Sequence, residues 1–302
     1  MIESIVHPLP HGIHLHCHAS GAPGRPVLLF LHGFPEGAFI WDELLAHFAR
    51  PEHGGYRCVA PFLRGFGRSS TPAEVEAYRA KHLVRDLAAL IALESPNAPL
   101  AALVAHDWGG AVAWNLANQH PQCLERLAII NSPHPGAFLR ELQHSPAQQD
   151  ASQYMHFLCR PDAEALLSAN GYQRLFGFFD TPAGQPPAWL TDAVRAQYRD
   201  LWAQGLTGAC NYYRASPLRP PRPGDDSVMA LALPPEMLTV SVPTLVLWGM
   251  DDPALLPGLL DGLPDWVPEL QLRPVEGASH WIVHEQPARV AQELGRFLLQ
   301  NK

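Results

Sequence analysis

The chain has 302 residues, of which 47% are hydrophobic and 17% are charged, and it carries a formal net charge of −8. This composition is typical of a globular protein, and no apolar run reaches the roughly 18 to 20 residues that a membrane span needs. The negative charge provides no basic surface for nucleic acid or anionic lipid, so we expect neither partner. The length suits one large domain or a domain with an insertion.

The cysteines are odd in number and widely spaced, at Cys17, Cys58, Cys123, Cys159 and Cys210. No Cys-x-x-Cys pair suggests a zinc site or a redox couple. Free thiols in a reducing compartment fit this pattern best. The N-terminal residues also lack the basic start and the apolar block of a signal peptide, so we expect a cytoplasmic protein.

Residues 12–18 alternate between polar and apolar side chains and predict a strand with His14, His16 and His18 on one face. Three histidines on one face could bind a metal. However, no Cys, Asp or Glu completes a ligand set, so a solvated face is the preferred interpretation. Residues 27–31 then form an unbroken apolar run, which is typical of a central strand buried on both sides.

The next segments continue the alternation of strand and helix. The turn His-Gly-Phe-Pro-Glu at 32–36 leads into a helix with an apolar face over 41–48. A short strand at 56–60 is followed by a glycine-rich loop at 64–70, and helical spacing returns at 83–91. The loop lacks the Gly-Lys-Ser/Thr ending of a phosphate-binding loop, so we interpret it as a packing turn.

Residues 100–110 combine a buried strand, a tight turn and the start of a helix. The apolar run breaks at His-Asp-Trp-Gly-Gly, with Ala105 and Gly109 on either side of the bend. This spacing is typical of a nucleophile elbow, in which a strained turn lifts one side chain clear of the sheet. The lifted residue is Asp107, whose carboxylate could attack an electrophilic carbon and form an ester. The alternative is that Asp107 only caps the following helix.

A buried helix at 111–119 and a strand at 127–130 favour an α/β fold with a parallel sheet. From residue 136 onward the pattern changes to helical segments rich in aromatic residues and broken by proline-rich pieces, with no strong strand. Strands at 243–248 and 270–275 and a last amphipathic helix then complete the sheet.

We therefore predict a core formed by residues 1–135 and 242–302 and a helical cap, or lid, formed by residues 136–241. The cap is inserted before the last two strands of a mostly parallel sheet that helices flank. Ligands in such sheets bind at the carboxyl ends of the strands. A segment inserted between two neighbouring strands leaves and re-enters the sheet near the carboxyl end of the first strand. We therefore expect the cap to lie over the carboxyl ends of the strands and to cover Asp107.

An ester on Asp107 has to be hydrolysed, which needs a base for water, best a histidine held by a second carboxylate. Asp251 and Asp252 follow the strand at 243–248, and His280 follows the last strand. The order nucleophile, acid, histidine is that of the α/β-hydrolases. For His280 alone, an ordinary loop histidine is the simpler interpretation, but its register with the two acids favours a catalytic triad.

Together with the turn at 32–36, these residues make the chain similar to the α/β-hydrolase superfamily and, more narrowly, to its epoxide hydrolases. The resemblance covers nearly the whole chain. It implies a turn that usually contains a cis proline, and an oxyanion hole formed by the backbone N–H groups of Phe34 and Trp108. It also implies that Asp252, rather than Asp251, is the acid of the triad.

Family epoxide hydrolases place two tyrosines above the nucleophile to hydrogen-bond the epoxide oxygen. The segment Asn-Tyr-Tyr-Arg at 211–214 matches the later one, which makes Tyr213 the ring opener and Tyr212 a wall residue. A looser match makes Tyr154 the earlier one. Phenols donate hydrogen bonds at neutral pH and can protonate a far more basic alkoxide. The alternative for each tyrosine is half-buried packing with a satisfied hydroxyl group.

The resemblance implies that an apolar epoxide is converted to a vicinal diol through a covalent ester, with no metal or organic cofactor. We expect an apolar pocket. The side chains predicted to line it are Phe34, Trp108, Met155, Phe157, Tyr212 and Trp281.

Two other functions stay open. Haloalkane and haloacid dehalogenases share this fold and nucleophile, and a ligand receptor without catalysis would use the same pocket. Haloalkane dehalogenases usually carry Asn or Glu where Phe34 stands, and fluoroacetate dehalogenases carry arginines just after the nucleophile, where this chain has Trp108 and Ala111. Both dehalogenase hypotheses are therefore less favoured. The sequence is compatible with a monomer or a homodimer.

Overall fold

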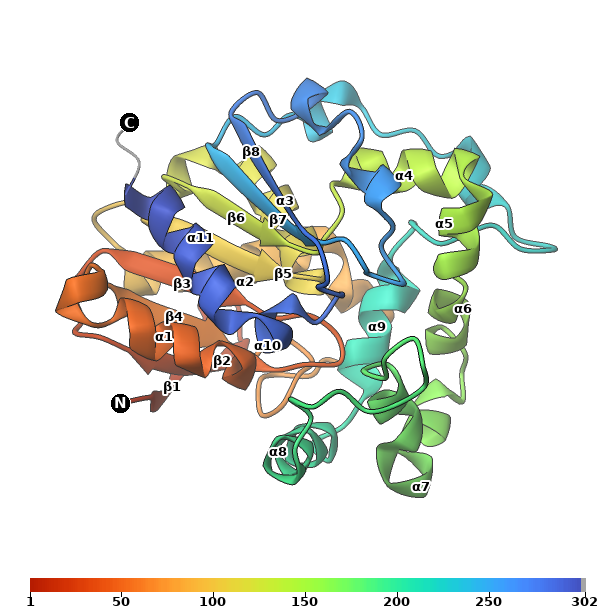
Figure 1. Cartoon of the computed structure of the whole chain (residues 1–302), viewed down its shortest axis with the longest axis horizontal. Coiled ribbons are helices and arrows are strands. Elements are labelled where there is room, and N and C mark those ends of the chain that lie inside the picture. Colours follow the sequence, from red (N-terminus) through yellow and green to blue (C-terminus); the bar gives the residue numbers. More distant parts are fainter. Residues whose placement is uncertain (300–302) are drawn as a thin grey trace.

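A computed structural model describes residues 1–299 of the chain (Figure 1). Within these residues an eight-stranded sheet has the order β1-β2-β4-β3-β5-β6-β7-β8. The strands are Glu3–Pro8 (β1), His14–Ser20 (β2), Val27–Leu31 (β3), Arg57–Pro61 (β4), Ala102–His106 (β5), Leu127–Ile130 (β6), Thr244–Gly249 (β7) and Leu270–Val275 (β8). Strand β2 is antiparallel to β1 and β4, whereas β4, β3 and β5 to β8 are mutually parallel.

Helices cover both faces of this sheet. Those near the sheet are Asp42–Phe48 (α1), Ala80–Glu94 (α2), Trp108–Gln119 (α3), Ile282–Glu285 (α10) and Pro287–Leu299 (α11). Helices α1 and α11 lie in front of the sheet in Figure 1, and α2 and α3 lie behind it. The α/β-hydrolase architecture predicted from the sequence is confirmed.

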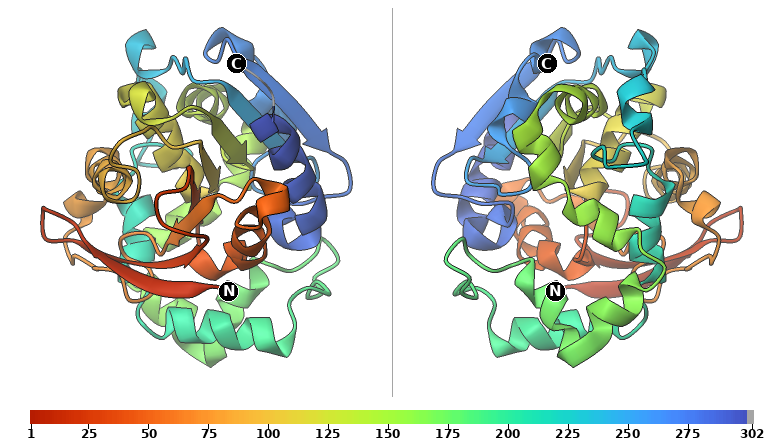
Figure 2. Two further views of the ribbon diagram at one scale, coloured as in Figure 1. Left: turned by 90° about the vertical axis from the view of Figure 1, so that its left-hand side faces the viewer. Right: turned by 90° about the vertical axis from the view of Figure 1, so that its right-hand side faces the viewer.

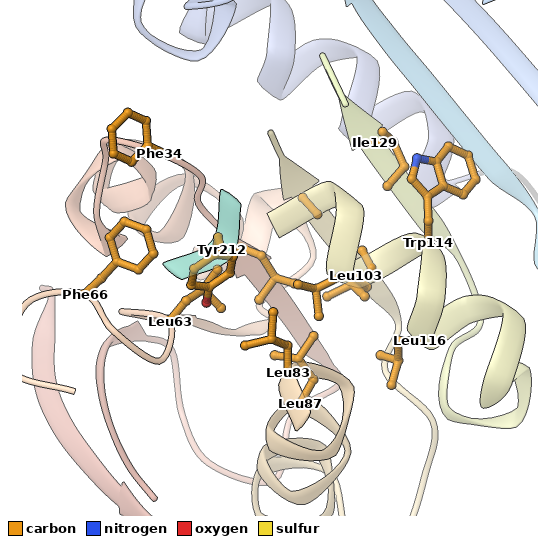
Figure 3. Packing of buried hydrophobic residues seen from close by; sticks show 14 of the residues in the cluster. Phe34, Leu63, Phe66, Leu83, Leu87, Leu103, Trp114, Leu116, Ile129 and Tyr212 are labelled. Atoms are coloured by element: carbon orange, nitrogen blue, oxygen red, sulfur yellow. The ribbon is translucent and has the colours of Figure 1, made fainter. Parts of the chain in front are cut away.

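Alternate residues of the central strands enter two separate hydrophobic clusters, which explains why these strands are apolar throughout. Phe30 of β3 packs with α1 and α11, whereas Leu29 packs on the opposite face. Figure 3 shows that opposite face, where Leu83 and Leu87 of α2 lie near Leu103 of β5. Because both faces are covered, the strands are buried along their whole length, as parallel strands usually are.

Strand β1 is the one strand of this sheet that the sequence analysis did not predict. It lies at the sheet edge, and its residues are exposed or half-buried without a fully buried face. An edge strand with one neighbour needs no continuous apolar pattern, so hydrophobic periodicity gives a weak signal there. The strand predicted at 12–18 is β2, where His14, His16 and His18 alternate with buried Leu15 and Cys17.

The segment between β6 and β7 is helical. It contains Pro135–His144 (α4), Pro146–Ala151 (α5), Tyr154–Leu158 (α6), Ala163–Gly177 (α7), Asp192–Trp202 (α8) and Thr207–Ala215 (α9). Both views of Figure 2 show α7 and α8, in green, at the bottom of the molecule. Trp202 of α8 donates a hydrogen bond to the carbonyl of Pro35, directly beyond β3. The insertion thus contacts the carboxyl end of the sheet.

Among residues 1–299, no helix combines the length and the apolar character needed to cross a bilayer. All five cysteines are free thiols, as the sequence predicts.

Candidate active site

Asp107 stands at the junction of β5 and α3 in a strained backbone conformation. Its φ is 49° and its ψ is −122°, a combination that non-glycine residues rarely adopt. The Ser132 hydroxyl donates a 2.6 Å hydrogen bond to the Asp107 carbonyl. Small residues make the turn possible, because a Cβ at Gly109 would lie 2.6 Å from the backbone oxygen of His32. The predicted elbow is therefore present.

The Asp107 side chain does not cap α3. Its Oδ1 instead accepts a 2.6 Å hydrogen bond from the backbone N–H of Phe34. Phe34 belongs to the turn after β3, in which the Phe34–Pro35 peptide bond is cis. Trp108 is the first residue of α3, so its N–H is one of those that a helix leaves unpaired. Its part in an oxyanion hole remains a prediction.

His280 lies between two carboxylates. Its Nδ1 is 2.6 Å from Oδ2 of Asp252, and its Nε2 is 3.7 Å from Oδ2 of Asp107. The first contact is a hydrogen bond, and the second is too long to be one. The Asp252 side chain is fully buried, whereas Asp251 is exposed. The three predicted triad residues thus lie together, with Asp252 rather than Asp251 next to the histidine.

Neighbouring charges keep His280 protonated in this arrangement. Burial by itself lowers the pKa of His280, but the carboxylates of Asp252 and Asp107 outweigh it and raise the pKa to about 9. Burial works to raise the pKa of Asp252, yet the positive charge of His280 and its hydrogen bonds bring that pKa below the ordinary value. The resting site therefore holds an imidazolium between two carboxylates.

Tyr154 of α6 and Tyr213 of α9 come together beside the nucleophile. Their ring centroids are 6.1 Å apart, and both side chains line the same cavity as Asp107. Burial raises the pKa of both phenols, and the negative charge of Asp107 raises it further. Both tyrosines are therefore neutral hydrogen-bond donors at neutral pH.

The cavity above Asp107 has a volume of about 270 Å³ and predominantly apolar walls. Trp108, Met155 and Tyr212, all predicted as pocket residues, line it. The Tyr212 hydroxyl donates to the backbone carbonyl of Arg64 at 3.0 Å, so this tyrosine already has a partner within the protein.

Three other predicted pocket residues are absent from the walls of this cavity. Phe34 packs edge-on against Tyr213, with ring centroids 5.3 Å apart, and its backbone N–H binds Asp107. The ring of Phe157 lies against the guanidinium group of Arg174. The indole N–H of Trp281 donates to a backbone carbonyl of the inserted segment. These three residues are close to site residues in the sequence, but that position did not predict where their side chains point.

Several polar residues that the sequence pattern did not indicate support the site. Asn131 has a φ of 38° and donates a 2.8 Å hydrogen bond to Oδ2 of Asp252. Glu36 and His106 are fully buried and lie directly behind the site. Glu36 ends the turn that contains Phe34, and His106 directly precedes Asp107. Their positions within the turn at 32–36 and within the elbow are the sequence features that could have indicated their roles.

Comparisons with known proteins agree with this geometry. Residues 26–287 match the family described as alpha/beta hydrolase fold, so the chain belongs to the α/β-hydrolase family. Within that family it falls in the epoxide hydrolase branch. It is 31% identical to Epoxide hydrolase 4 of Mus musculus, over 96% of this chain and 77% of that protein. It is also 36% identical to the AB hydrolase superfamily protein YfhM of Bacillus subtilis (strain 168), over 95% of each chain.

Solved structures are similar as well. The structure of an epoxide hydrolase from Bacillus megaterium with an inhibitor aligns with a TM-score of 0.88 and 28% identity, covering 98% of this chain and 100% of that one. A structure from a study of epoxide hydrolases in metagenomes from hot environments aligns with a TM-score of 0.85 and 34% identity, covering all of both chains.

Proposed function

We propose that this protein is an epoxide hydrolase that adds water to an apolar epoxide and releases a vicinal diol. One observation carries the proposal: a single cavity holds the carboxylate of Asp107 together with the phenols of Tyr154 and Tyr213. Opening an epoxide requires a nucleophile at carbon and a proton donor at oxygen. The names of the similar proteins support the same class of reaction.

In the first step, Oδ2 of Asp107 attacks an epoxide carbon and the bond from that carbon to oxygen breaks. Oδ2 is the attacking atom because the Phe34 N–H already occupies Oδ1. Tyr154 and Tyr213 hold the departing oxygen, and one of them gives it a proton, which yields a hydroxyalkyl ester on Asp107. The phenol is a suitable acid because the alkoxide is far more basic.

In the second step, water hydrolyses the ester. Esterification removes the negative charge of Asp107, which is one of the charges that hold the pKa of His280 at about 9. The pKa of His280 then falls, so the ring gives up its proton, which restores the phenol that protonated the epoxide oxygen, and becomes a base for water. Water attacks Cγ of Asp107 and gives one proton to Nε2 of His280, while negative charge develops on Oδ1 at the Phe34 N–H. The bond from Cγ to Oδ2 then breaks, and the departing oxygen takes the second proton of the water, which releases the diol and restores the Asp107 carboxylate.

We also propose that residues 136–241 act as a cap over residues 1–135 and 242–302. Both phenols belong to this segment, whereas the triad residues follow strands of the core. The cap therefore supplies the acid and the core supplies the nucleophile. This division assigns ring opening to both parts and ester hydrolysis to the core.

The variant His280→Gln tests the covalent scheme. It retains Asp107 and both phenols, so alkylation proceeds while hydrolysis stalls. After incubation with terminal, aryl and internal epoxides, intact-mass spectrometry should show a protein heavier by one epoxide. The double variant Asp107→Ala/His280→Gln is the matched control and should show no adduct. A His280→Gln protein that stays unmodified with every epoxide would contradict the scheme.

Product assays separate the proposed reaction from that of a dehalogenase. Wild-type protein should form diols from epoxides and release no halide from haloalkanes or haloacids. Halide release without diol formation would show that the same nucleophile catalyses dehalogenation. Tight epoxide binding with neither product would indicate a receptor.

A further inference from the structure

The cavity above Asp107 extends along helix α3. Its walls include Trp108, Ala111, Val112 and Asn115. These residues are spaced i, i+3, i+4 and i+7, so they form one face of the helix that begins directly after Asp107. At 1.5 Å per residue, the face from Trp108 to Asn115 is about 10 Å long. The cavity is therefore a channel that follows this face, with the nucleophile at its inner end.

Apolar side chains face α3 across the channel. Leu83 of α2 and Phe138 of α4 line it, together with Leu218 and Leu233 of the segment that follows α9. A chain of methylene groups in this space would lose its contact with water on every side. Burial of apolar surface is favourable, so the channel suits an elongated apolar group.

The outer end of the channel opens to solvent. Met237, Pro217 and Arg79 line the cavity and are exposed. The Arg79 side chain is 58% exposed and pairs with Glu76 at 2.8 Å. Among residues 1–299, Arg79 and Asp107 are the only charged residues in the lining. The stretch between the nucleophile and the mouth thus favours an uncharged group.

Aromatic rings pack in the space beside the nucleophile that the channel does not occupy. Phe34, Phe178 and Trp281, here called the aromatic wall, are absent from the lining of the cavity. The Phe178 ring packs edge-on against Phe34 and Tyr154, with centroids 5.7 and 6.0 Å away. The indole N–H of Trp281 donates to the Phe178 carbonyl at 3.1 Å. A separate cavity beside Phe34 measures only about 10 Å³, which is no more than the space for one water molecule.

We propose that the substrates are terminal epoxides, which carry one elongated apolar substituent on one ring carbon and none on the other. The ring lies between Asp107 and the two phenols, and the substituent occupies the channel. Ala111 keeps the channel open because it presents only a methyl group to it. Phe34 closes the side on which a second substituent would lie. Both are specificity-determining residues, and their assignment rests on the proposed function, which it narrows to one class of epoxides.

Isomeric epoxides test this proposal in wild-type protein. Epoxyoctane with the ring at the end of the chain (the terminal isomer) and trans-epoxyoctane with the ring in the middle (the central isomer) contain the same atoms. We expect kcat/KM for diol formation to be about 10- to 100-fold higher for the terminal isomer, because the central isomer has to force a propyl group into packed aromatic rings. Equal values for the two isomers would overturn the proposal.

A series of chain lengths tests the channel itself. From terminal epoxybutane through epoxyhexane to epoxyoctane, kcat/KM should rise by up to about fourfold for each methylene group that the channel buries. A value that does not rise along this series would show that the substituent lies outside the channel.

The variant Ala111→Phe places a ring in the middle of the channel. The preference for terminal epoxyoctane over terminal epoxybutane should then fall by about tenfold or more, because the longer chain loses its contacts with the walls. Gln119→Phe is the matched control, because it places the same ring at the exposed end of α3, outside the cavity, and should keep the preference. A folded Ala111→Phe protein with the wild-type preference would overturn the channel.

Phe34→Ala tests the aromatic wall and replaces Ala111→Phe if that variant does not fold. It retains the backbone N–H that binds Asp107 but removes the ring, so the preference for the terminal over the central isomer should fall about tenfold. Both isomers are measured on the same protein, so a general loss of activity cancels in the ratio. An unchanged ratio would overturn the assignment of Phe34.

Binding of the product diols separates this proposal from the proposed function. Isothermal titration calorimetry of wild-type protein with the vicinal octanediols of the two isomers needs no turnover. We expect the terminal diol to bind about tenfold more tightly than the central one. Equal affinities would overturn the proposal. If the protein forms no diol from any epoxide, the proposed function is contradicted, and the calorimetry alone decides whether the cavity accepts one substituent or two.

Discussion

The regions around Asp107 and Asp252 hold carboxylates on opposite sides of one histidine, in contrasting surroundings. Asp252 is fully buried, and its oxygens accept from Asn131, His280 and the backbone N–H groups of Ala254 and Leu255. The side chain of Asp107 is 14% exposed, opens onto the cavity and accepts one hydrogen bond, from the Phe34 N–H.

This difference indicates how two identical side chains take different tasks. A carboxylate whose lone pairs are all occupied can hold a charge but has none free to attack carbon. Asp107 has a free oxygen, and its strained backbone keeps that oxygen aimed at the cavity. The surroundings therefore assign nucleophilic attack to Asp107 and orientation of the base to Asp252.

The largest effect is expected from Asp252→Asn. The new amide places an N–H group where Oδ2 accepts from Asn131 and His280, so His280 can no longer present Nε2 as a base. Ester hydrolysis should fall by about 10³- to 10⁴-fold, as when the carboxylate of a hydrolase triad is replaced by an amide. Intact-mass spectrometry should show the alkyl-enzyme accumulating during turnover.

Asp251→Asn is the matched control, because Asp251 is the exposed neighbour and its backbone N–H donates to the carbonyl of Ala278. Its hydrolysis rate should stay at the wild-type level. Equal losses in the two variants would show that the contrast between the buried and the exposed carboxylate has no catalytic meaning.

An intermediate effect is expected from Tyr213→Phe and Tyr154→Phe. Each variant removes one hydrogen bond to the developing alkoxide, and hydrogen bonds to charged groups are worth about 1.5–3 kcal/mol, or about 10- to 100-fold in rate. Stopped-flow alkylation should slow by this factor, while hydrolysis of the formed ester is retained. Tyr212→Phe loses only the bond to the Arg64 carbonyl and should alkylate normally. Normal alkylation in Tyr213→Phe would remove this phenol from ring opening.

The fold and the grouping of the triad residues could be predicted from the sequence because the patterns that indicate them are local. Asp107, Asp252 and His280 follow β5, β7 and β8, and the carboxyl ends of parallel strands lie at one edge of a sheet. The elbow at Asp107 is likewise encoded by its immediate neighbours, chiefly Gly109.

The remaining features depend on contacts between distant segments. Glu36 and His284 are 248 positions apart, and no local pattern marks either residue as a partner of the other. Phe157 and Trp281 are aromatic neighbours of site residues, yet their side chains pack elsewhere. The direction of a side chain depends on helix rotation and loop packing, which composition and spacing do not define.

The smallest effect is on stability and follows from the charge on His280. Its pKa in the folded protein is about 9, above the ordinary 6.5, so folding favours its protonated form. This contribution is complete below about pH 6.5, declines as the unfolded chain loses the proton, and is gone above about pH 9. The difference between the two pKa values limits the contribution of His280 to the free energy of unfolding to about 3 kcal/mol. Polar relaxation around the site should reduce this contribution to about 1 kcal/mol.

The free energy of unfolding in urea should therefore decline across this pH window more in wild-type protein than in His280→Gln. Parallel curves for the two proteins would mean that Asp107 and Asp252 do not jointly hold the proton on His280, and the contrast between the two carboxylates would lose its electrostatic basis.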